Sequence, residues 1–286
     1  MEKIIVPGSE SKKLAEKVAK NSNLKICKTE LRRFPDNEIY LRILTDVKGR
    51  HCIVIQSTPT SDAFLELIFI LDTLKDLGAE TINAVIPYIG YSRQDKRFLP
   101  GEAISIKTIL GVISEKADRI TTVNAHFLSK FPNEYESLKI KNLTAFPLIA
   151  KYFKKKLKRP VLIAPDKGAL RYVKEAASVL NCKFGYFEKK RISSEEVEMK
   201  IEDIDVSGKD AVILDDIIST GGTMLKAIEI LKNENANTIN VGCVHAVLLK
   251  GIEKVAKFAD EVICTDSIFR EKFSKVSLAK IISENL

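Results

Sequence analysis

Two adjacent carboxylates, Asp215 and Asp216, follow the apolar run 211–214 and are the first residues whose spacing could do chemistry. A turn rich in hydroxyls and glycines comes next and leads into an amphipathic segment at 222–233. Backbone N–H groups at the start of a helix attract phosphate, and glycines let the backbone approach its oxygens closely. The residues of this turn that we expect to hold phosphate are Ser219, Thr220, Gly221, Gly222 and Thr223.

The acidic pair needs a partner other than the phosphate, because two carboxylates beside a phosphate would repel it. A vicinal diol donates two hydrogen bonds, and a bound cation could supply compensating charge. Ribose 5-phosphate meets these requirements, with its phosphate in the turn and its 2- and 3-hydroxyls on Asp215 and Asp216. An N-capped helix after an acidic turn would explain one Ser or Thr, but it does not explain the acidic pair together with two glycines.

These residues carry a family resemblance. The segment 215–223 is similar to the signature loop of type I phosphoribosyltransferases and of the pyrophosphokinases that make their donor. In the first half of the chain, the segments 32–38 and 91–97 resemble the ATP-site segments of ribose-phosphate pyrophosphokinases. The resemblance implies that Phe34 stacks on adenine and that Asp36 and Glu38 accept hydrogen bonds from its polar edge. The residues that it assigns to ATP are Phe34, Asp36, Glu38, Arg93, Gln94, Asp95 and Lys96.

The same resemblance implies a Mg2+ site. The family usually has Asp-x-His where this chain has Asn124-Ala125-His126, so His126 fits the metal ligand while Asn124 departs from the acidic pattern. Asp166, in the segment Pro165-Asp166-Lys167-Gly168, resembles the second metal contact. Mg2+ keeps waters and substrate phosphates as ligands, so two protein contacts are sufficient. Asp166 could equally cap a helix, and the two roles are compatible.

A polar stretch from Phe187 to Asp205 resembles the mobile catalytic loop of the family, with Lys189 and Arg191 as its Lys-x-Arg pair. Cations are what phosphoryl transfer needs when charge spreads over the transferring group. On composition alone this stretch is a charged flexible loop. The resemblance implies that the 1-hydroxyl of ribose 5-phosphate attacks the β-phosphorus of Mg-ATP and that AMP leaves.

The elements that position these residues fall into two similar halves. Three short matches recur at one offset of roughly 158 residues, for example 4–7 with 162–165 and 81–83 with 238–240. We therefore expect two tandem, duplicated type I phosphoribosyltransferase-like domains, 1–148 and 149–286, each a mostly parallel α/β sheet flanked by helices. Ligands of such sheets bind beyond the carboxyl ends of the strands.

Alternation of apolar runs and helical periodicity gives the expected elements. The expected strands are 3–6, 24–28, 38–44, 52–56, 81–87, 119–123, 161–165, 182–187, 211–215, 238–246 and 261–264. The expected helices are 9–20, 61–77, 103–116, 168–180, 222–233 and 250–257.

Composition narrows the class of protein. The chain has 286 residues with a net charge of +8, and no apolar stretch is long enough for a membrane span. Five cysteines without a Cys-x-x-Cys motif indicate buried reduced thiols, hence a cytoplasmic protein. The basic cluster 151–159 reads as a solvated helix end, since the positive charges elsewhere mix with acids. We expect no nucleic acid and no membrane as partners.

Rival functions remain open at this point. A nucleobase phosphoribosyltransferase would share segment 215–223 but would not need a second domain with an adenine segment. A catalytically silent regulatory homologue should have lost the catalytic or metal residues, and here Lys189, Arg191, His126 and Asp166 are all present. The resemblance also implies that the segment with Phe34 serves a neighbouring subunit, so we expect a homodimer or a higher homo-oligomer built from dimers.

Overall fold

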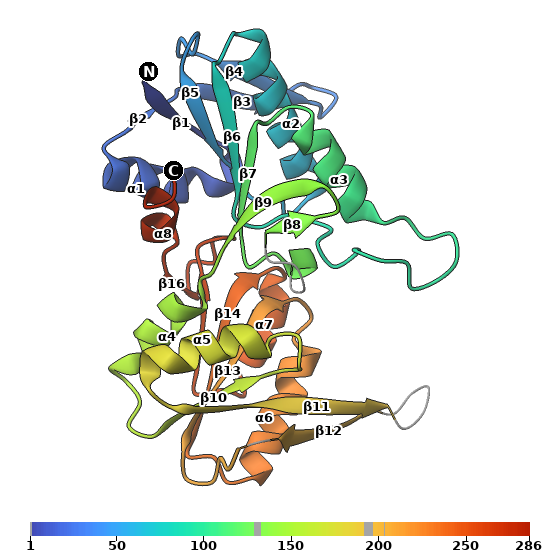
Figure 1. Cartoon of the computed structure of the whole chain (residues 1–286), viewed down its shortest axis with the longest axis vertical. Helices are drawn as coiled ribbons and strands as arrows, with labels where there is room; N and C mark the ends of the chain where they lie inside the picture. Colours follow the sequence, from blue (N-terminus) through green and yellow to red (C-terminus); the bar gives the residue numbers. More distant parts are fainter. Residues whose placement is uncertain (1, 129–132, 192–196, 203) are drawn as a thin grey trace. The chain divides into compact units, whose positions relative to one another are not determined.

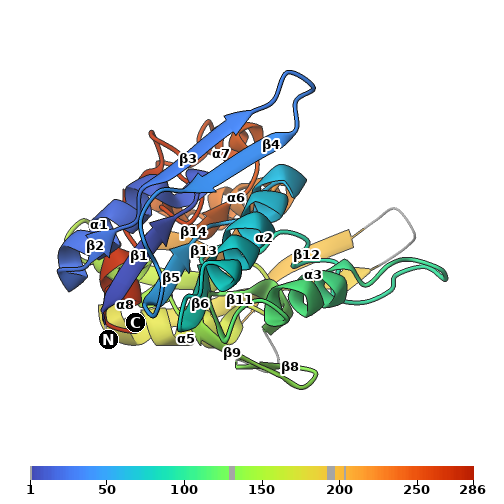
Figure 2. The same cartoon turned by 90° about the horizontal axis from the view of Figure 1, so that it is seen from above.

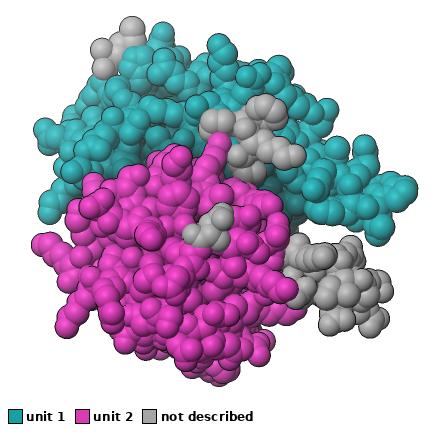
Figure 3. Space-filling model, turned by 60° about the horizontal axis from the view of Figure 1, so that its bottom comes forward, with its two compact units in different colours: residues 1–143, 267–269, 277–286 teal, residues 144–266, 270–276 magenta. Residues whose placement is uncertain are grey.

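The computed structural model describes residues 2–128, 133–191, 197–202 and 204–286, without the side chains of 189–191 and 197–198. The chain divides into two compact units, shown in Figure 3. The first comprises residues 1–143, 267–269 and 277–286, and the second comprises 144–266 and 270–276. The expected division after residue 148 falls inside helix α4 (Phe146–Lys154), which belongs wholly to the second unit. Sequence patterns did not reveal that the segment 277–286 belongs to the first unit.

The first unit contains a sheet of order β2-β1-β5-β6-β7-β9-β8 (Figure 1). All neighbours pair in parallel except β8 and β9. The strands are β1 (Lys3–Pro7), β2 (Lys25–Ile26), β5 (His51–Ile55), β6 (Thr81–Ile86), β7 (Arg119–Val123), β8 (Glu134–Tyr135) and β9 (Leu138–Leu143). The helices are η1 (Ser9–Ser11), α1 (Lys12–Ser22), α2 (Ser61–Asp76), α3 (Ser105–Ser114), η2 (His126–Leu128) and α8 (Ala279–Ser283).

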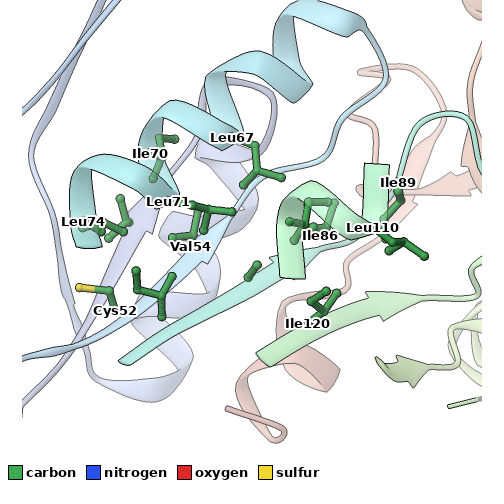
Figure 4. Close-up of a cluster of buried hydrophobic side chains, with 14 of the residues drawn as sticks. Cys52, Val54, Leu67, Ile70, Leu71, Leu74, Ile86, Ile89, Leu110 and Ile120 are labelled. Carbon is green, nitrogen blue, oxygen red and sulfur yellow. The ribbon is translucent and has the colours of Figure 1, made fainter. Parts of the chain in front are cut away.

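Helix α2 forms where the sequence changes from a capping residue to apolar positions at helical spacing. The Oγ1 atom of Thr60 accepts a hydrogen bond from the Ala63 N–H at 3.2 Å, which satisfies one unpaired donor of the first turn. The buried apolar side chains of α2 pack on strands β5 and β6 together with α3 (Figure 4), whereas Leu65 and Phe69 are exposed. The α2 residues in this core include Leu67, Ile70, Leu71 and Leu74.

A separate antiparallel hairpin, formed by β3 (Thr29–Arg33) and β4 (Ile39–Ile43), carries the segment assigned to adenine (Figure 2). The expected strand 24–28 is wrong in its extent, because only Lys25 and Ile26 pair with β1. Strand β3 was not expected, since it is polar apart from Leu31 and lies outside the main sheet. Backbone hydrogen bonds between β3 and β4 stabilise the hairpin. Such bonds do not depend on side-chain type, so the sequence of β3 shows no alternation of apolar and polar residues.

The second unit contains the sheet β12-β11-β10-β13-β14-β15-β16, which repeats the order of six parallel strands of the first sheet but has its antiparallel strand, β12, at the opposite edge. Its neighbours are parallel except β11 and β12. The strands are β10 (Pro160–Ala164), β11 (Lys183–Arg191), β12 (Val197–Glu202), β13 (Asp210–Ile218), β14 (Thr238–Ala246), β15 (Glu261–Thr265) and β16 (Ser274–Val276). Besides α4, its helices are α5 (Leu170–Leu180), α6 (Gly222–Asn233) and α7 (Leu249–Val255). The expected class, two α/β domains with mostly parallel sheets, is confirmed.

Two expected boundaries in this unit are wrong. The stretch from Phe187 is not a loop throughout, because β11 continues to Arg191 and pairs with β12 as a hairpin. Phe187 is fully buried in the core. The charged residues after it stay in the strand because their backbone groups pair with β12. Strand β13 extends to Ile218, three residues past the expected end at 215, so Asp216 lies within the strand together with Asp215.

All five cysteines are free. Four are buried as expected, whereas Cys182 is half-buried and departs from the expectation. Within the described residues, no helix combines the length and apolar character that crossing a membrane requires.

Candidate active site

The turn after β13 has the backbone geometry of an anion cradle. Gly221 lies at the N-terminus of α6 with φ of 82°, a left-handed conformation that glycine adopts without strain. The Gly221 carbonyl accepts the hydrogen bond of the Leu225 N–H at 3.0 Å and so starts the helix. Gly222, Thr220 and Thr223 are exposed, so this end of α6 is open to a ligand. The structure thus brings 219–223 together as one loop at a helix N-terminus.

Helix α7 supports this loop through a second glycine. A Cβ atom on Gly251 would lie 1.6 Å from the Ser219 carbonyl oxygen, and one on Gly221 would lie 2.9 Å from the Gly251 oxygen. The two backbones can pack this closely only because both positions lack a side chain. Sequence reasoning missed Gly251, although an isolated glycine within an expected helix, 250–257, is a signal that a close contact is present.

Three carboxylates converge beside this loop. Strands β10 and β13 are parallel neighbours. Asp166 follows β10, and Asp215 and Asp216 lie near the carboxyl end of β13, so these carboxylates lie toward the same edge of the sheet. Burial raises the pKa of Asp215 well above its usual range, and the nearby charges of Asp216 and Asp166 raise it further. The Asp215 Oδ1 atom accepts a hydrogen bond from the Asp216 N–H at 2.9 Å. Such a group of like charges favours a bound cation or the hydroxyl donors of a ligand.

Asp166 also holds the turn before helix α5. Its Oδ1 atom accepts hydrogen bonds from the N–H groups of Gly168 at 2.9 Å and Ala169 at 3.3 Å. The expected helix N-cap role is therefore wrong, because α5 begins at Leu170 with Ala169 as its N-cap and no side-chain cap bond, and Asp166 holds the turn before the helix instead. The other Asp166 carboxylate oxygen is the atom that could bind a metal while this turn persists.

Strand β11 leads to the expected catalytic pair. Lys189 pairs in register with Met199 and Arg191 with Val197, so both stand near the tip of the hairpin. The tip itself, 192–196, and the side chains of Lys189 and Arg191 lie outside the described residues. One residue before the pair, Glu188 accepts a hydrogen bond from Lys167 Nζ at 2.8 Å. Sequence reasoning missed this pair, since the two residues are far apart along the chain.

In the first unit, Phe34 occupies the turn of the β3–β4 hairpin and is 40% exposed. Its ring meets Tyr40 edge to face, with ring centres 5.5 Å apart, and the Arg32 guanidinium lies over both rings. Asn37 has φ of 73°, which closes the turn, and the Asp36 Oδ1 atom accepts from the Glu38 N–H at 3.3 Å. The aromatic face and both carboxylates are therefore accessible.

Arg33 fixes the base of this turn and was not singled out from the sequence. Its guanidinium donates to the Asn37 carbonyl at 2.7 Å and to Asp62 Oδ2 at 2.5 Å. Since Asp62 lies in the first turn of α2, the same side chain links the turn to that helix.

The polar segment after β6 folds back on itself. The backbone N–H of Gln94 donates to the Tyr91 carbonyl at 2.9 Å. The side-chain Nε2 of Gln94 donates to Glu102 Oε2 at 3.5 Å. Glu102 also accepts the N–H groups of Phe98 and Leu99, and these bonds lower its pKa. In this loop the side chains of Arg93 and Lys96 are exposed, and those of Gln94 and Asp95 are half-buried.

His126 begins η2, directly after β7, and is half-buried. Asn124 is buried with φ of 41°, and its N–H donates to the Leu143 carbonyl at 2.9 Å. Asparagine and aspartate both tolerate this left-handed backbone, so the conformation accommodates Asn124 but does not explain why Asn stands where the family usually has Asp. No group of three or more His, Cys, Asp or Glu side chains suited to a metal occurs among the described residues.

Comparisons with known proteins agree on one family. Residues 3–127 match the N-terminal domain of ribose phosphate pyrophosphokinase, and residues 139–278 match the phosphoribosyl transferase domain. Ribose-phosphate pyrophosphokinase of Methanothermobacter thermautotrophicus is 42% identical over 98% of this chain and 99% of its own. The ribose-phosphate pyrophosphokinase of Pyrococcus abyssi is 40% identical over 99% of this chain and 98% of its own. The crystal structure of phosphoribosylpyrophosphate synthetase from Mycobacterium smegmatis has the same fold, with a TM-score of 0.84 at 24% identity, over 100% of this chain and 97% of that one.

Proposed function

This chain belongs to the ribose-phosphate pyrophosphokinase family, and from that premise we propose how its residues divide the work of the reaction. The enzyme transfers the β,γ-diphosphate of ATP to the 1-hydroxyl of ribose 5-phosphate and yields AMP and 5-phosphoribosyl 1-diphosphate for nucleotide biosynthesis. The observation that carries the assignment of residues is the close packing of Gly251 against Ser219, which shapes an open cradle at the start of α6.

Ribose 5-phosphate binds in this cradle. Its phosphate accepts from the backbone N–H groups and hydroxyls of 219–223, where the start of a helix favours negative charge. Its 2- and 3-hydroxyls donate to Asp215 and Asp216. The support is the position of both carboxyl groups near the carboxyl end of β13, directly before the loop, where hydroxyl donors would stabilise their charges.

ATP binds to residues of the first unit. The exposed face of Phe34 stacks on adenine, while Asp36 and Glu38 accept from its amino edge. Gln94 and Asp95 hold the nucleotide, with Arg93 and Lys96 on its phosphates. The support is the accessibility of these side chains and the rigid turn that Arg33 provides.

Mg2+ is the cofactor that we propose, with His126 and Asp166 as its protein ligands. Burial and the negative charges of Asp216 and Asp166 raise the pKa of Asp215, and a hard cation bound by Asp166 would compensate these like charges. When bound, the metal would neutralise negative charge on the phosphate oxygens.

Lys189 and Arg191 act on the transferring group. The sugar hydroxyl attacks the β-phosphorus in line, and the two cations stabilise the charge that spreads over the equatorial oxygens. No covalent enzyme intermediate is required, so positioning and electrostatic stabilisation account for catalysis.

The assignment is tested by incubating the protein with ATP, Mg2+ and ribose 5-phosphate and analysing the nucleotides. AMP should appear stoichiometrically with the sugar diphosphate, whereas ADP would mean transfer of a single phosphoryl group. By calorimetry, Asp216→Asn should weaken ribose 5-phosphate more than ATP. Normal binding of the sugar phosphate to both Asp216→Asn and Asp215→Asn would contradict the placement of the diol.

We also propose that the protein acts in the cytoplasm as a homodimer or a higher assembly of dimers, with Phe34 serving the partner chain. Five free cysteines support a reducing compartment. Phe34→Ala and Lys189→Ala chains, each nearly inactive, should regain about a quarter of wild-type sites when unfolded and refolded together as dimers. Activity no higher than the mean of the separate variants, with chain exchange verified by mass labelling, would show that Phe34 serves the active site of its own chain.

A further inference from the structure

Glu102 closes a turn beside the segment that we assign to ATP. This turn, residues 97–102, lies in the loop between β6 and α3 (Figure 1). The Glu102 Oε2 atom accepts hydrogen bonds from the N–H groups of Phe98 at 2.7 Å and Leu99 at 3.0 Å. The bonds from Leu99 and Phe98 lower the pKa of Glu102, so this side chain is an ionised carboxylate at neutral pH.

The same carboxylate connects the turn to a residue of the ATP segment. The side-chain Nε2 of Gln94 donates to Glu102 Oε2 at 3.5 Å, and the N–H of Ile106 in α3 donates to the Gln94 carbonyl at 3.4 Å. Both bonds are long, so they persist only while the turn and the helix keep their places. The side chains of Arg93 and Lys96 are exposed on either side of Gln94, and its conformation therefore decides where their charges stand.

Burial of side chains does not hold this turn in place. All residues from 96 to 101 are exposed, with Phe98 at 61% and Leu99 at 65%. The Lys96 Nζ atom lies 5.2 Å from the centre of the Phe98 ring, and such a contact at an exposed site is weak. Charge-assisted bonds from backbone N–H groups to a carboxylate are among the stronger hydrogen bonds. The conformation of the turn therefore depends mainly on the Glu102 side chain.

We propose that Glu102 is a positioning residue for ATP, because it holds the turn 97–102 and through it the conformation of Gln94. This inference rests on the proposed assignment of 93–96 to ATP. Glu102 itself needs no contact with ATP, since its charge is directed to donors of its own loop and would repel a triphosphate. Loss of the carboxylate should weaken ATP and spare ribose 5-phosphate, and an uncharged acceptor of the same length should restore ATP.

The test begins with steady-state kinetics of Glu102→Ala and Glu102→Gln. Substitution by alanine keeps the backbone carbonyl at 102, which accepts from Arg97 Nε at 2.9 Å, and removes only the carboxylate. The KM for ATP should rise about five- to 30-fold, the effect of losing one or two ordinary hydrogen bonds, while the KM for ribose 5-phosphate changes by less than about twofold. Glutamine keeps an acceptor oxygen, so the KM for ATP of Glu102→Gln should stay within about threefold of the wild-type value.

Amide hydrogen exchange reports on the turn independently of activity. In Glu102→Ala the amides of Phe98 and Leu99 should exchange at least about fivefold faster than in the wild type, and in Glu102→Gln they should stay protected. Unchanged exchange in Glu102→Ala would overturn the inference, because the carboxylate would then not hold the turn. Faster exchange with an unchanged KM for ATP would overturn it equally, because the turn would then not position the nucleotide site.

Asp46→Ala is the matched control. The Asp46 Oδ1 atom accepts the Lys48 N–H at 3.1 Å in another loop of the first unit, and its removal should leave both KM values unchanged. The proposed function fails in a different way. If Arg93→Ala and Lys96→Ala both leave the KM for ATP unchanged, the assignment of 93–96 to ATP is wrong and the inference loses its premise. A raised KM for ATP in these two variants, with a normal KM in Glu102→Ala, refutes the inference alone.

Discussion

Gly251→Ala offers a direct test of the proposed sugar-phosphate loop, because the substitution lies outside the loop and adds a single methyl group. The new Cβ atom would lie 1.6 Å from the Ser219 carbonyl oxygen, and real Cβ contacts essentially never fall below 3.0 Å. The Ser219 backbone or helix α7 must therefore move apart by at least the difference, about 1.4 Å. Hydrogen bonds form within a window of roughly 0.5 Å in length, so such a shift removes at least one N–H from the phosphate.

A hydrogen bond to a charged group contributes about 1.5–3 kcal/mol, which corresponds to a change in affinity of roughly ten- to 150-fold. We expect the KM for ribose 5-phosphate to rise by that factor, with the KM for ATP nearly unchanged. Overpacking should also lower stability by about 1–3 kcal/mol, which thermal unfolding measures.

Gly111→Ala is the control, since no heavy atom lies within 4 Å of a Cβ atom built there. Gly111 lies inside α3, so alanine should stabilise the protein by about 0.5–1 kcal/mol and leave both KM values unchanged. If folded Gly251→Ala enzyme binds ribose 5-phosphate as wild type does, the loop after β13 does not hold the phosphate.

Three further outcomes follow from the site. Lys189→Ala and Arg191→Ala should lower kcat with modest changes in substrate dissociation constants, because their contacts form mainly in the transition state; unchanged kcat with weaker binding would make them binding groups only. Asp215 has a raised pKa when folded, so stability should fall as pH rises from the ordinary aspartate range through the raised value. Asp215→Asn should then raise the melting temperature at neutral pH while weakening ribose 5-phosphate, and an equal or lower melting temperature would contradict the buried like-charge repulsion. Phe34→Ala should raise the KM for ATP about five- to 150-fold through lost stacking of about 1–3 kcal/mol, and an unchanged KM would exclude the ring from the adenine site.

The sequence by itself determined the fold class and located the loop that we propose binds phosphate. An apolar run, two acids and a hydroxyl- and glycine-rich turn are contiguous from 211 to 223, and local chemistry of this kind persists whatever surrounds it. The helix 222–233 was likewise predicted with its observed bounds, because α6 buries one face at helical spacing. The segments assigned to ATP depended on resemblance to a family, since a polar segment with one aromatic has no period of its own.

Only the tertiary structure revealed the contacts between residues distant in the chain. Gly251 against Ser219, Lys167 with Glu188, and Arg33 with Asp62 each join separate elements. The return of 277–286 to the first unit is of the same kind, because α8 packs on α1 at the opposite end of the sequence. Periodicity reports which face of an element is buried, but it carries no information about which other element covers that face. Which elements contact each other therefore depends on the order in which the chain connects the strands of the two sheets.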